Sequence, residues 1–420
     1  MTYLAFLQAN LRWVAGGFLL TFASSFGQTY YISLFAGQIR SEFALSHGDF
    51  GALYAIATVG SAFTLIWLGK LADTMRAVYL GIGALFGLAA ACIGMGLVSS
   101  AIMLVFVLYG LRLFGQGMLS HIAFTLMGKW FNAQRGRAVS LVSLGFAGGE
   151  ALAPFAVVAL AAAIGWRQTW FLAAAILVLG FAPLVWRSFY VQRVPKGKVQ
   201  KSENVPDEPS PVRDWTRKEV LRDFVFYATL PGLLTPTFMI TGILFHQVHL
   251  VETKGWELAV FTTSYPIFAG CAVVIGLWAG SIVDRWSACA FLPVFLLPLA
   301  AGALLLAYVD ALWAAYGFML LMGVTVGISP VMHGGLWAEL YGTRHLGAIR
   351  ALDTSLMVFT SALAPVTMGW LIDIGVELET QFIWMAGYIF VVSVMLFVLF
   401  KTNRVSTAHA LSSSTLEAAR

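Results

Sequence analysis

Charged residues are scarce in this sequence. Asp, Glu, Lys and Arg make up 11% of its 420 residues, and hydrophobic residues make up 60%. A soluble domain has about 25% charged and about 45–50% apolar residues. A water-soluble domain of this composition would expose wide apolar faces, and nucleic-acid-binding or disordered chains need far more charge. The composition excludes these classes and predicts a polytopic membrane protein.

Cysteine and the common active-site motifs are also scarce. Cys92, Cys271 and Cys289 stand in apolar stretches without metal-ligand spacing, so we expect buried thiols, no disulfide framework and no metal site. Residues 69–71 lack the glycine-rich stretch of a phosphate loop, which argues against ATP. No nucleophile and base recur at workable spacing, so we expect no enzyme activity and no cofactor.

Long apolar runs predict an all-α membrane protein with twelve transmembrane helices. About 20 helical residues cross a bilayer core of about 30 Å, because only a helix satisfies its own backbone there. The first run is too long for a signal-peptide core and is expected to be retained. The expected order is an N-terminal segment 1–12, a six-helix bundle 13–186, a linker 187–223, a second six-helix bundle 224–400 and a tail 401–420.

The basic residues predict the orientation. Most of the 25 Lys and Arg residues fall in the linker, the tail and the loops on the same side as the N-terminus, whereas Arg40, Arg167 and Lys254 fall on the opposite side. Basic loops stay on the cytoplasmic side of a membrane. We therefore expect both termini in the cytoplasm and the protein in the plasma (inner) membrane. The pI near 9.1 then needs no nucleic-acid partner.

The two halves repeat each other. A constant offset of 211 residues superposes uncommon residues, and the pairs are Tyr54 with Tyr265, Trp67 with Trp278, Gly69 with Gly280, Asp73 with Asp284, Gly136 with Gly347, and Pro154 with Pro365. Two parallel six-helix repeats are the arrangement in which transporters hold a substrate near the bilayer midplane.

Several motifs resemble those of the major facilitator superfamily. Residues 69–76 are similar to its loop between the second and third helices, and residues 280–285 form a fainter second copy. Residues 112–117 resemble its fourth-helix motif R-x-x-x-Q-G, and residues 145–154 resemble its glycine-rich fifth-helix motif. The resemblance implies two six-helix halves and gating loops on the cytoplasmic side. The implied gating residues are Asp73, Arg76, Asp284 and Arg285, for which simple helix capping is the alternative.

Four charged residues fall inside predicted spans, where each charge costs about 2.5–3.5 kcal/mol. They are Arg112, Glu150, Arg350 and Asp353. Arg112 and Gln116 lie one helical turn apart, so both point into the central cavity if the fourth helix lines it. Glu150 is a candidate proton carrier, with a structural Arg112–Glu150 ion pair as the alternative. Arg350 and Asp353 are expected to brace a gate.

Polar residues inside the spans complete the candidate pathway. His246 and His249 share a face at the outer end of the seventh helix, where they could sense external pH or simply form interfacial hydrogen bonds. His333 and Ser329 share a face of the tenth helix, unless His333 is a satisfied core residue. Helical spacing places Ser24, Gln28 and Tyr31 on one cavity-lining face of the first helix, and Thr237 and Thr241 on the seventh.

Residues 129–138 resemble bacterial relatives of the monocarboxylate porters, although the arginine those proteins carry in the eighth helix is absent from residues 269–283. Recognition of an anion then requires Arg112 to take the place of that arginine. The leading hypothesis, from the twelve-span repeat with Arg112 and Glu150 inside it, is a monomeric, proton-coupled secondary transporter of a small organic solute, with a carboxylate as one candidate. A proton-driven efflux antiporter of amphipathic compounds is the second hypothesis. A non-transporting membrane sensor or scaffold is the third, although the linker shows no domain-sized apolar pattern.

Overall fold

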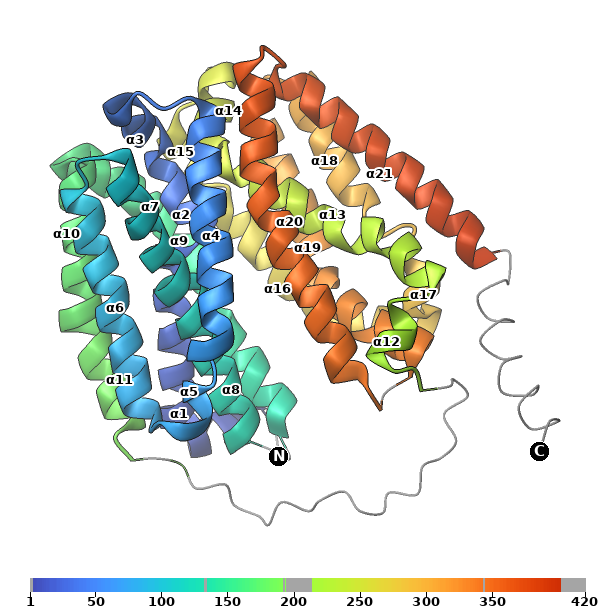
Figure 1. Ribbon diagram of the computed structural model, residues 1–420, viewed down its shortest axis with the longest axis horizontal. Helices are drawn as coiled ribbons and strands as arrows, with labels where there is room; N and C mark the ends of the chain where they lie inside the picture. The colour runs from blue at the N-terminus through green and yellow to red at the C-terminus, as the bar shows by residue number, and fades with distance from the viewer. Residues whose placement is uncertain (1–2, 132–133, 192, 194–213, 343, 402–420) are drawn as a thin grey trace. The chain divides into compact units, whose positions relative to one another are not determined.

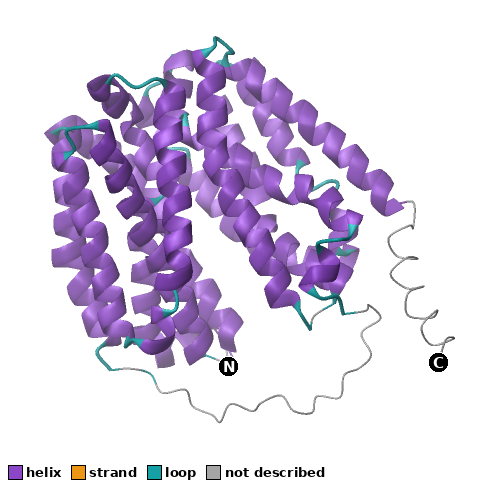
Figure 2. Ribbon diagram, viewed as in Figure 1, coloured by secondary structure: helices purple, strands orange, loops and turns teal. Residues whose placement is uncertain are grey.

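A computed structural model of the chain describes residues 3–131, 134–191, 193, 214–342 and 344–401, and omits the side chains of residues 3–5, 73, 135 and 280–286. Within these ranges the chain forms helices and no strand (Figure 2). Figure 1 gives the helix labels used below. The linker residues 194–213 and the tail residues 402–420 lie outside the described ranges.

Ten helical segments are long and apolar enough to cross a membrane among the residues described. The segments are His47–Leu68 (α4), Ala77–Leu97 (α6), Ala101–Trp130 (α7, η3 and α8), Gly136–Ile164 in α9, Trp166–Phe189 (α10, η5 and α11), Phe224–Phe245 (α13), Leu258–Ala279 (α15 and the start of α16), Trp313–Tyr341 (α19), Leu346–Asp373 (α20) and Leu378–Lys401 (α21). These agree with ten of the twelve predicted spans. The first and ninth predicted spans are interrupted.

Two prolines lie at the interruption of the ninth predicted span. In place of one helix, the chain forms α17 (Ala288–Phe291), a turn, and α18 (Leu297–Tyr308). Pro293 lies in the turn and Pro298 lies in the first turn of α18. Since proline has no N–H group and fixes its own φ, it is tolerated at a helix start but ends a helix that precedes it. The first predicted span is broken within a polar stretch, described below.

The chain divides into two compact units. The first unit contains residues Met1–Val199 together with two segments of the second half, Thr241–Ala269 and Ala362–Gly375. The second unit contains Gln200–Ile240, Gly270–Ser361 and Val376–Arg420. One end of the second repeat therefore packs as part of the first unit, and each unit is described by itself below.

Small residues set the packing inside the first unit. Helix α9 (Arg135–Ile164) packs along α1 (Tyr3–Ala23). A Cβ atom at Gly145 would collide with Thr21, and one at Gly149 would collide with Ser25. Thr21 donates its hydroxyl to the Val142 carbonyl at 2.7 Å. The glycine pair of the fifth-helix motif therefore allows close helix approach, as small residues do in membranes.

The second unit is packed around α18 and α19. Helix α18 packs against α19 and α21, and Trp337 of α19 packs on Phe226 with ring centroids 5.2 Å apart. A Cβ atom at Gly327 would lie 3.0 Å from the Gly276 nitrogen, so α16 (Tyr265–Trp286) and α19 meet almost backbone to backbone.

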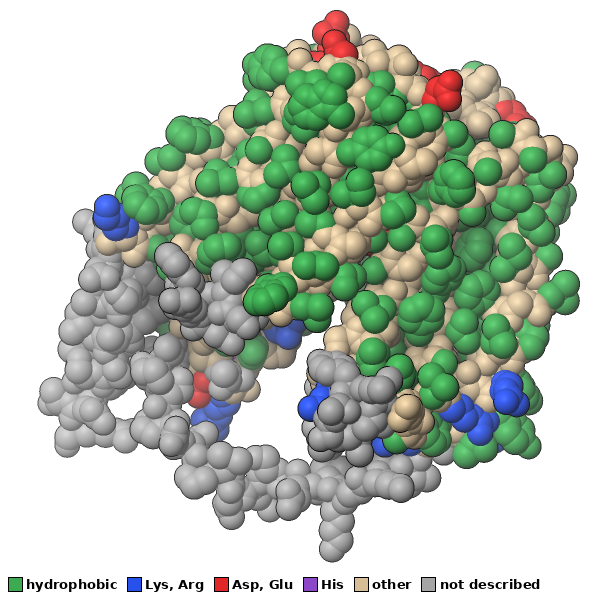
Figure 3. All heavy atoms as spheres, turned by 180° about the vertical axis from the view of Figure 1, so that it is seen from behind, with side chains coloured by type: hydrophobic (Ala, Val, Ile, Leu, Met, Phe, Trp, Pro, Cys, Tyr) green, Lys and Arg blue, Asp and Glu red, His purple; other side chains and the backbone are tan. Residues whose placement is uncertain are grey.

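Large hydrophobic side chains remain on the outside of the molecule, as the face in Figure 3 shows. Such a surface suits lipid.

Residues paired by the sequence repeat have matching environments. Tyr54 and Tyr265 are fully buried, whereas Trp67 and Trp278 expose 63% and 66% of their surface. The repeated pattern therefore reflects equivalent positions in the two halves.

Candidate functional site

The first predicted span is not one continuous helix. After α1 ends at Ala23, Ser24–Gly27 form a 3₁₀ turn (η1) and Gln28 is extended, with φ −81° and ψ 154°. Helix α2 (Thr29–Ile32), the turn η2 (Ser33–Phe35) and α3 (Ala36–Phe43) follow. The predicted shared face of Ser24, Gln28 and Tyr31 is therefore wrong, because that spacing requires unbroken helix. Ser24 and Tyr31 are buried, and Gln28 is half-buried.

The break exposes backbone carbonyls to a buried arginine. Arg112 is 2% exposed, and its Nη1 donates to the Gly27 carbonyl and to Thr29 Oγ1, both at 3.3 Å. The guanidinium lies 5.0 Å from the centroid of the Tyr54 ring, and the Tyr54 hydroxyl is 2.6 Å from Thr29 Oγ1. Unwound carbonyls and half-helix ends form ligand sites in transporters.

Two glycines hold this arrangement together. Arg112 lies in η3 (Leu111–Leu119), which is a π-helix, although the sequence predicted ordinary α-helix. A Cβ atom at Gly115 would lie 2.5 Å from Gly27 Cα, so the break and η3 touch at their backbones. Short π-helical stretches often occur at functional sites. Gln116, one turn after Arg112, is half-buried.

Glu150 lies near the middle of α9 and is half-buried. It makes no hydrogen bond or ion pair with any described residue, and Arg112 has its polar contacts with Gly27 and Thr29. The alternative of an Arg112–Glu150 ion pair is therefore not what the structure contains. The charge of Glu150 acts on the hydroxyl groups of Tyr30 and Tyr265, whose rings lie 6.1 Å apart.

A buried glutamine that the sequence interpretation missed connects both sequence halves. Gln247 donates to the Tyr30 carbonyl at 2.9 Å and to Ser33 Oγ at 2.7 Å, and accepts from the Tyr265 hydroxyl at 2.7 Å. Ser33 in turn donates to the Leu244 carbonyl at 2.7 Å. Gln247 in α14 (Gln247–Lys254) reads as an unremarkable polar residue beside a span end, so only its partners reveal its position.

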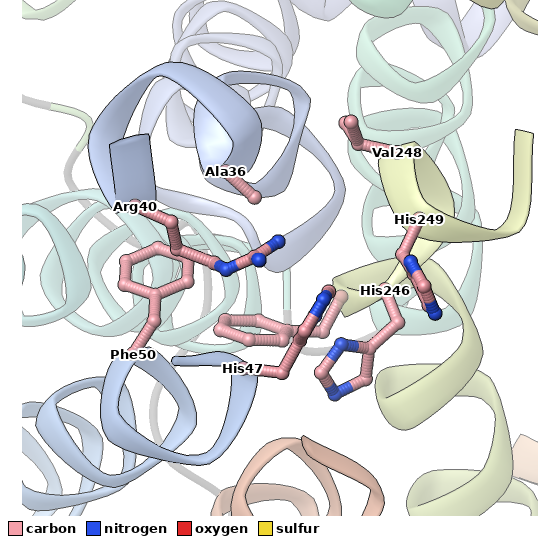
Figure 4. A pocket seen from close by; sticks show the side chains of 8 residues that line it. Ala36, Arg40, His47, Phe50, His246, Val248 and His249 are labelled. Carbon is pink, nitrogen blue, oxygen red and sulfur yellow. The ribbon is translucent and has the colours of Figure 1, made fainter. Parts of the chain in front are cut away.

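Three histidines meet at the end of the first unit that the sequence predicts to be outside. The rings of His47 and His249 lie 4.3 Å apart, and those of His47 and His246 lie 5.8 Å apart (Figure 4). With Arg40 they line a cavity of about 10 Å³, room for about one water. Asp373, at the end of α20, accepts the backbone N–H groups of His47 and Gly48. We call His47, His246 and His249 the histidine cluster.

His246 is held neutral in this cluster. It immediately follows the α13 span and is buried, and its Nε2–H donates to the Pro365 carbonyl at 3.0 Å. Burial lowers the pKa of His246 to about 3, and the neighbouring cationic groups His47, His249 and Arg40 lower it as well, against the opposing effect of the Pro365 hydrogen bond. The structure thus joins the predicted His246 and His249 with His47, which the sequence interpretation had passed over.

The second unit joins two residues that the sequence interpretation had kept apart. His333 Nδ1 lies 2.7 Å from Asp353 Oδ2, and both side chains are buried. Arg350 is exposed, whereas the Asp353 carboxylate turns inward to α19, so the two side chains do not pair with each other. Their role at a gate stays a prediction. Ser329, a turn before His333, is half-buried.

The remaining candidates contribute less to these clusters. Thr237 and Thr241 are half-buried in α13. Arg76 is exposed and lies over the Tyr79 ring. The side chains of Asp73, Asp284 and Arg285 lie outside the described part of the chain. Helix α6 begins after Arg76, so Asp73 belongs to the short α5 (Leu71–Thr74) and does not begin a long helix.

The cysteines and possible metal ligands were also located. Cys92 is buried as predicted, but Cys271 and Cys289 are half-buried, so that expectation is wrong for the latter two. Among the described side chains, no group of three or more His, Cys, Asp or Glu residues is arranged to hold a metal ion.

The model of the Major Facilitator Superfamily matches residues 17–349. The chain belongs to this superfamily, and it is a multi-pass integral membrane protein with a transporter fold. It is 26% identical over 304 residues to the uncharacterized 38 kDa protein in the 23S RNA operon of Thermoproteus tenax. The aligned region covers 70% of this chain and 71% of the relative.

Solved transporter structures share the fold at low sequence identity. A bacterial homolog of the human lysosomal transporter Spinster, inward-facing and unoccupied, superposes with a TM-score of 0.70 at 15% identity, covering 92% of this chain and 96% of that one. A mutant of the nucleoside transporter NupG gives 0.68 at 15% identity, covering 92% and 99%. A mutant of the peptide transporter POT gives 0.67 at 15% identity, covering 93% and 94%.

Proposed function

We propose that the protein is a proton-coupled secondary transporter of a small carboxylate, working by alternating access in the plasma membrane with both termini in the cytoplasm. The observation that carries this proposal is Arg112, a cation buried within a transmembrane segment without an acidic partner among the described residues. A buried charge without a counter-ion is costly. An anionic solute would supply the missing charge.

The surroundings of Arg112 support binding of a carboxylate. Its Nη1 is engaged by Gly27 and Thr29, while its Nε is buried without a hydrogen-bond partner in the described structure. A guanidinium offers five donors in a fixed fork that matches a carboxylate. The Tyr54 ring below the guanidinium and the Thr29 hydroxyl would orient it toward such a ligand.

Glu150 supports the coupling to protons. A carboxylate in the middle of a membrane helix, without a cationic partner among the described residues, exchanges a proton more readily than one fixed in an ion pair. Its side chain is half-buried. The Tyr265 hydroxyl, on which the charge of Glu150 acts, donates to Gln247, and Gln247 donates to the backbone carbonyl of Tyr30. The charge state of Glu150 is therefore coupled to contacts between the two sequence halves.

Uptake by proteoliposomes tests the proposal. Vesicles containing the purified protein receive an inward proton gradient and a panel of radiolabelled monocarboxylates, with lactate and pyruvate first. We expect accumulation of at least one of them above its equilibrium level, abolished by a protonophore. Glu150→Gln should abolish accumulation but retain exchange of labelled for unlabelled solute, because exchange needs no net proton movement.

The matched control is Glu257→Gln, which neutralises an exposed carboxylate before α15 and should transport like the wild type. Equal accumulation with and without the gradient, or full activity of Glu150→Gln, would contradict proton coupling through Glu150. Export of amphipathic dyes with no carboxylate uptake would favour the efflux hypothesis instead.

A further inference from the structure

His333 and Asp353 form a buried pair of ionisable groups in the described part of the second unit. His333 lies on α19 and Asp353 on α20, with Nδ1 and Oδ2 2.7 Å apart. Asp353 is 2% exposed and His333 6%. His333 is eight residues from the end of α19 and Asp353 seven from the start of α20, which places each about 10–12 Å along its helix at 1.5 Å per residue.

Two of the four polar side-chain atoms of this pair have no hydrogen-bond partner among the described groups. The Nε2 of His333 and the Oδ1 of Asp353 are buried and make no hydrogen bond with any described group. Nearly all buried polar atoms in proteins have a partner, and those that do not call for an explanation. Both leftover atoms have lone pairs if the ring is neutral. The site therefore has room for a proton on Nε2, while no described group donates a hydrogen bond to either atom.

The geometry specifies where that proton binds. A carboxylate oxygen can only accept, so Nδ1–H is the donor in the short contact and the neutral ring keeps its lone pair on Nε2. Addition of one proton at Nε2 converts a neutral imidazole beside a carboxylate into an imidazolium–carboxylate pair. The net charge of the site changes from −1 to 0, which removes an uncompensated buried charge.

No other described charge balances the pair. Glu339 accepts the N–H groups of Ala288 and Cys289 at the start of α17, and Asp223 accepts the Tyr341 hydroxyl. Helix α18, packed on α19, brings no charged residue and only Tyr308 as a titratable one, and Arg350 is exposed. The side chains of Asp284 and Arg285 on α16 lie outside the described residues.

We propose that His333 and Asp353 form a second proton-binding site, separate from Glu150, which takes up one coupling proton at His333 Nε2. The proposal rests on the transport function argued above, because a proton site of this kind serves coupling. It also accounts for the burial of a histidine and an aspartate two turns inside their helices, where hydrophobic residues would be less costly.

The test follows protonation directly and needs no knowledge of the solute. The full chain, labelled with ¹⁵N-histidine and placed in lipid nanodiscs, is titrated by NMR between about pH 8 and about pH 5, the range in which histidine changes charge. The His333 signal is assigned by its disappearance in His333→Gln. We expect its Nε2 to become protonated in this range while Nδ1 stays protonated throughout.

Matched variants establish the role of the carboxylate. Asp353→Asn should lower the proton affinity of His333, because the variant loses the carboxylate that lies 2.7 Å from Nδ1. Asp353→Glu keeps the carboxylate, so His333 should titrate in this variant nearly as in the wild type. This variant keeps the proposal testable if Asp353→Asn fails to fold. Arg350→Gln, one turn away and exposed, should change nothing, and His345→Gln removes only an exposed histidine signal.

A His333 ring that stays neutral down to about pH 5, the acid end of that range, or one with the same proton affinity in Asp353→Asn as in the wild type, would overturn the proposal. Its failure is distinct from failure of the transport proposal. Proton-driven uptake with a silent His333 would disprove only this site. A normal His333 titration in a protein that moves no solute would support the proton-binding site but disprove its coupling role together with the transport function.

Discussion

The Asp373 carboxylate accepts the backbone N–H of Gly48 at 2.7 Å and that of His47 at 3.0 Å. The carboxylate at the end of α20 thus satisfies free donors at the start of α4, to which the sequence adds its own Ser46–Asp49 capping box. The backbones are also close, since a Cβ atom at Gly51 would lie 2.6 Å from the Pro365 carbonyl oxygen. We call this contact between α4 and α20, together with the adjoining histidine cluster, the closure. The proposed alternating access requires the closure to form and break.

Asp373→Ala should therefore loosen the closure. Loss of a capping carboxylate costs about 1 kcal/mol, which corresponds to about fivefold faster hydrogen exchange of the start of α4 and the end of α20. Exchange of the protein in nanodiscs, read by mass spectrometry, measures both segments. Asp49→Ala is the control: it removes a cap within α4 alone and should speed exchange in α4 only. Acceleration confined to α4 in both variants would contradict a link between α4 and α20.

Acid should loosen the same closure through His246. Its pKa in the closed structure is lowered, chiefly by burial, to about 3, whereas a solvated histidine has about 6.5. Above about pH 6.5 the ring is neutral whether the closure is closed or open. As the pH falls from about 6.5 toward 3, the open form binds the extra proton, so the closed form loses up to about 1.4 kcal/mol per pH unit.

Hydrogen exchange of residues 243–254, corrected for the intrinsic effect of pH, measures this loss. The wild type should show weaker protection at about pH 5 than at about pH 7. His246→Gln should remove part of the difference, because His47 belongs to the same cluster, with its ring 5.8 Å from that of His246. An identical pH dependence in that variant would show that another group controls the closure.

Two variants of Arg112 should separate the effect of its charge on solute binding from the effect of its donor geometry. Arg112→Lys keeps the cation but loses the fork, and Arg112→Gln loses both. A hydrogen bond to a charged group contributes about 1.5–3 kcal/mol, so we expect KM for a transported carboxylate to rise about tenfold or more in the lysine variant and further in the glutamine variant. Uptake kinetics in proteoliposomes give both values. An unchanged KM in Arg112→Gln would exclude Arg112 from solute binding.

The contact of Gly115 with Gly27 should tolerate no side chain. Gly115→Ala puts a methyl group against the Gly27 backbone, where neither helix can give way, and overpacking of this kind costs about 1–3 kcal/mol. The thermal unfolding temperature of the purified protein should fall by several degrees. Gly117→Ala serves as the control, because its Cβ meets Leu65 at an ordinary 3.4 Å. Equal stability of the two variants would contradict the close contact.

The hydrogen bonds of Gln247 should stabilise α14, so that an apolar side chain of similar size cannot replace it. Gln247→Leu leaves Ser33 and Tyr265 without their buried partner, and an unsatisfied buried group costs about 1–3 kcal/mol. We expect faster exchange of α14 and slower transport. Gln38→Leu changes an exposed glutamine nearby in sequence and should have little effect. Wild-type exchange rates in Gln247→Leu would show that the hydrogen bonds of Gln247 do not stabilise the packing of α14.

Composition and apolar runs predicted the membrane class and ten of the described spans, because burial in lipid acts on stretches of about 20 residues. Interruptions were harder to foresee. Ser24, Ser25 and Gly27 are compatible with a helix, and the break depends on contact with Gly115 and Arg112. Pro293 and Pro298 lie at the break of the ninth segment, but Pro231 and Pro236 have the same spacing and lie inside the continuous α13, so proline spacing alone does not predict a break.

The individual site residues were partly predictable. Arg112, Glu150 and Asp353 stand out because charges are costly in lipid. Their partners depend on tertiary packing: Asp353 is nearer in sequence to Arg350 than to His333, yet it binds His333. Gln247 and Asp373 gave no signal, because each lies beside a span end, where polar residues are common and need no special explanation.

Solute-dependent proton movement tests the central claim most directly. Vesicles containing the protein and the pH dye pyranine receive the monocarboxylate panel in the absence of any imposed gradient. The account predicts that a transported carboxylate acidifies the interior of wild-type vesicles, and that vesicles with Glu150→Gln take up the label only by exchange and show no acidification. Uptake of solute by the wild type without any change in internal pH would contradict proton coupling.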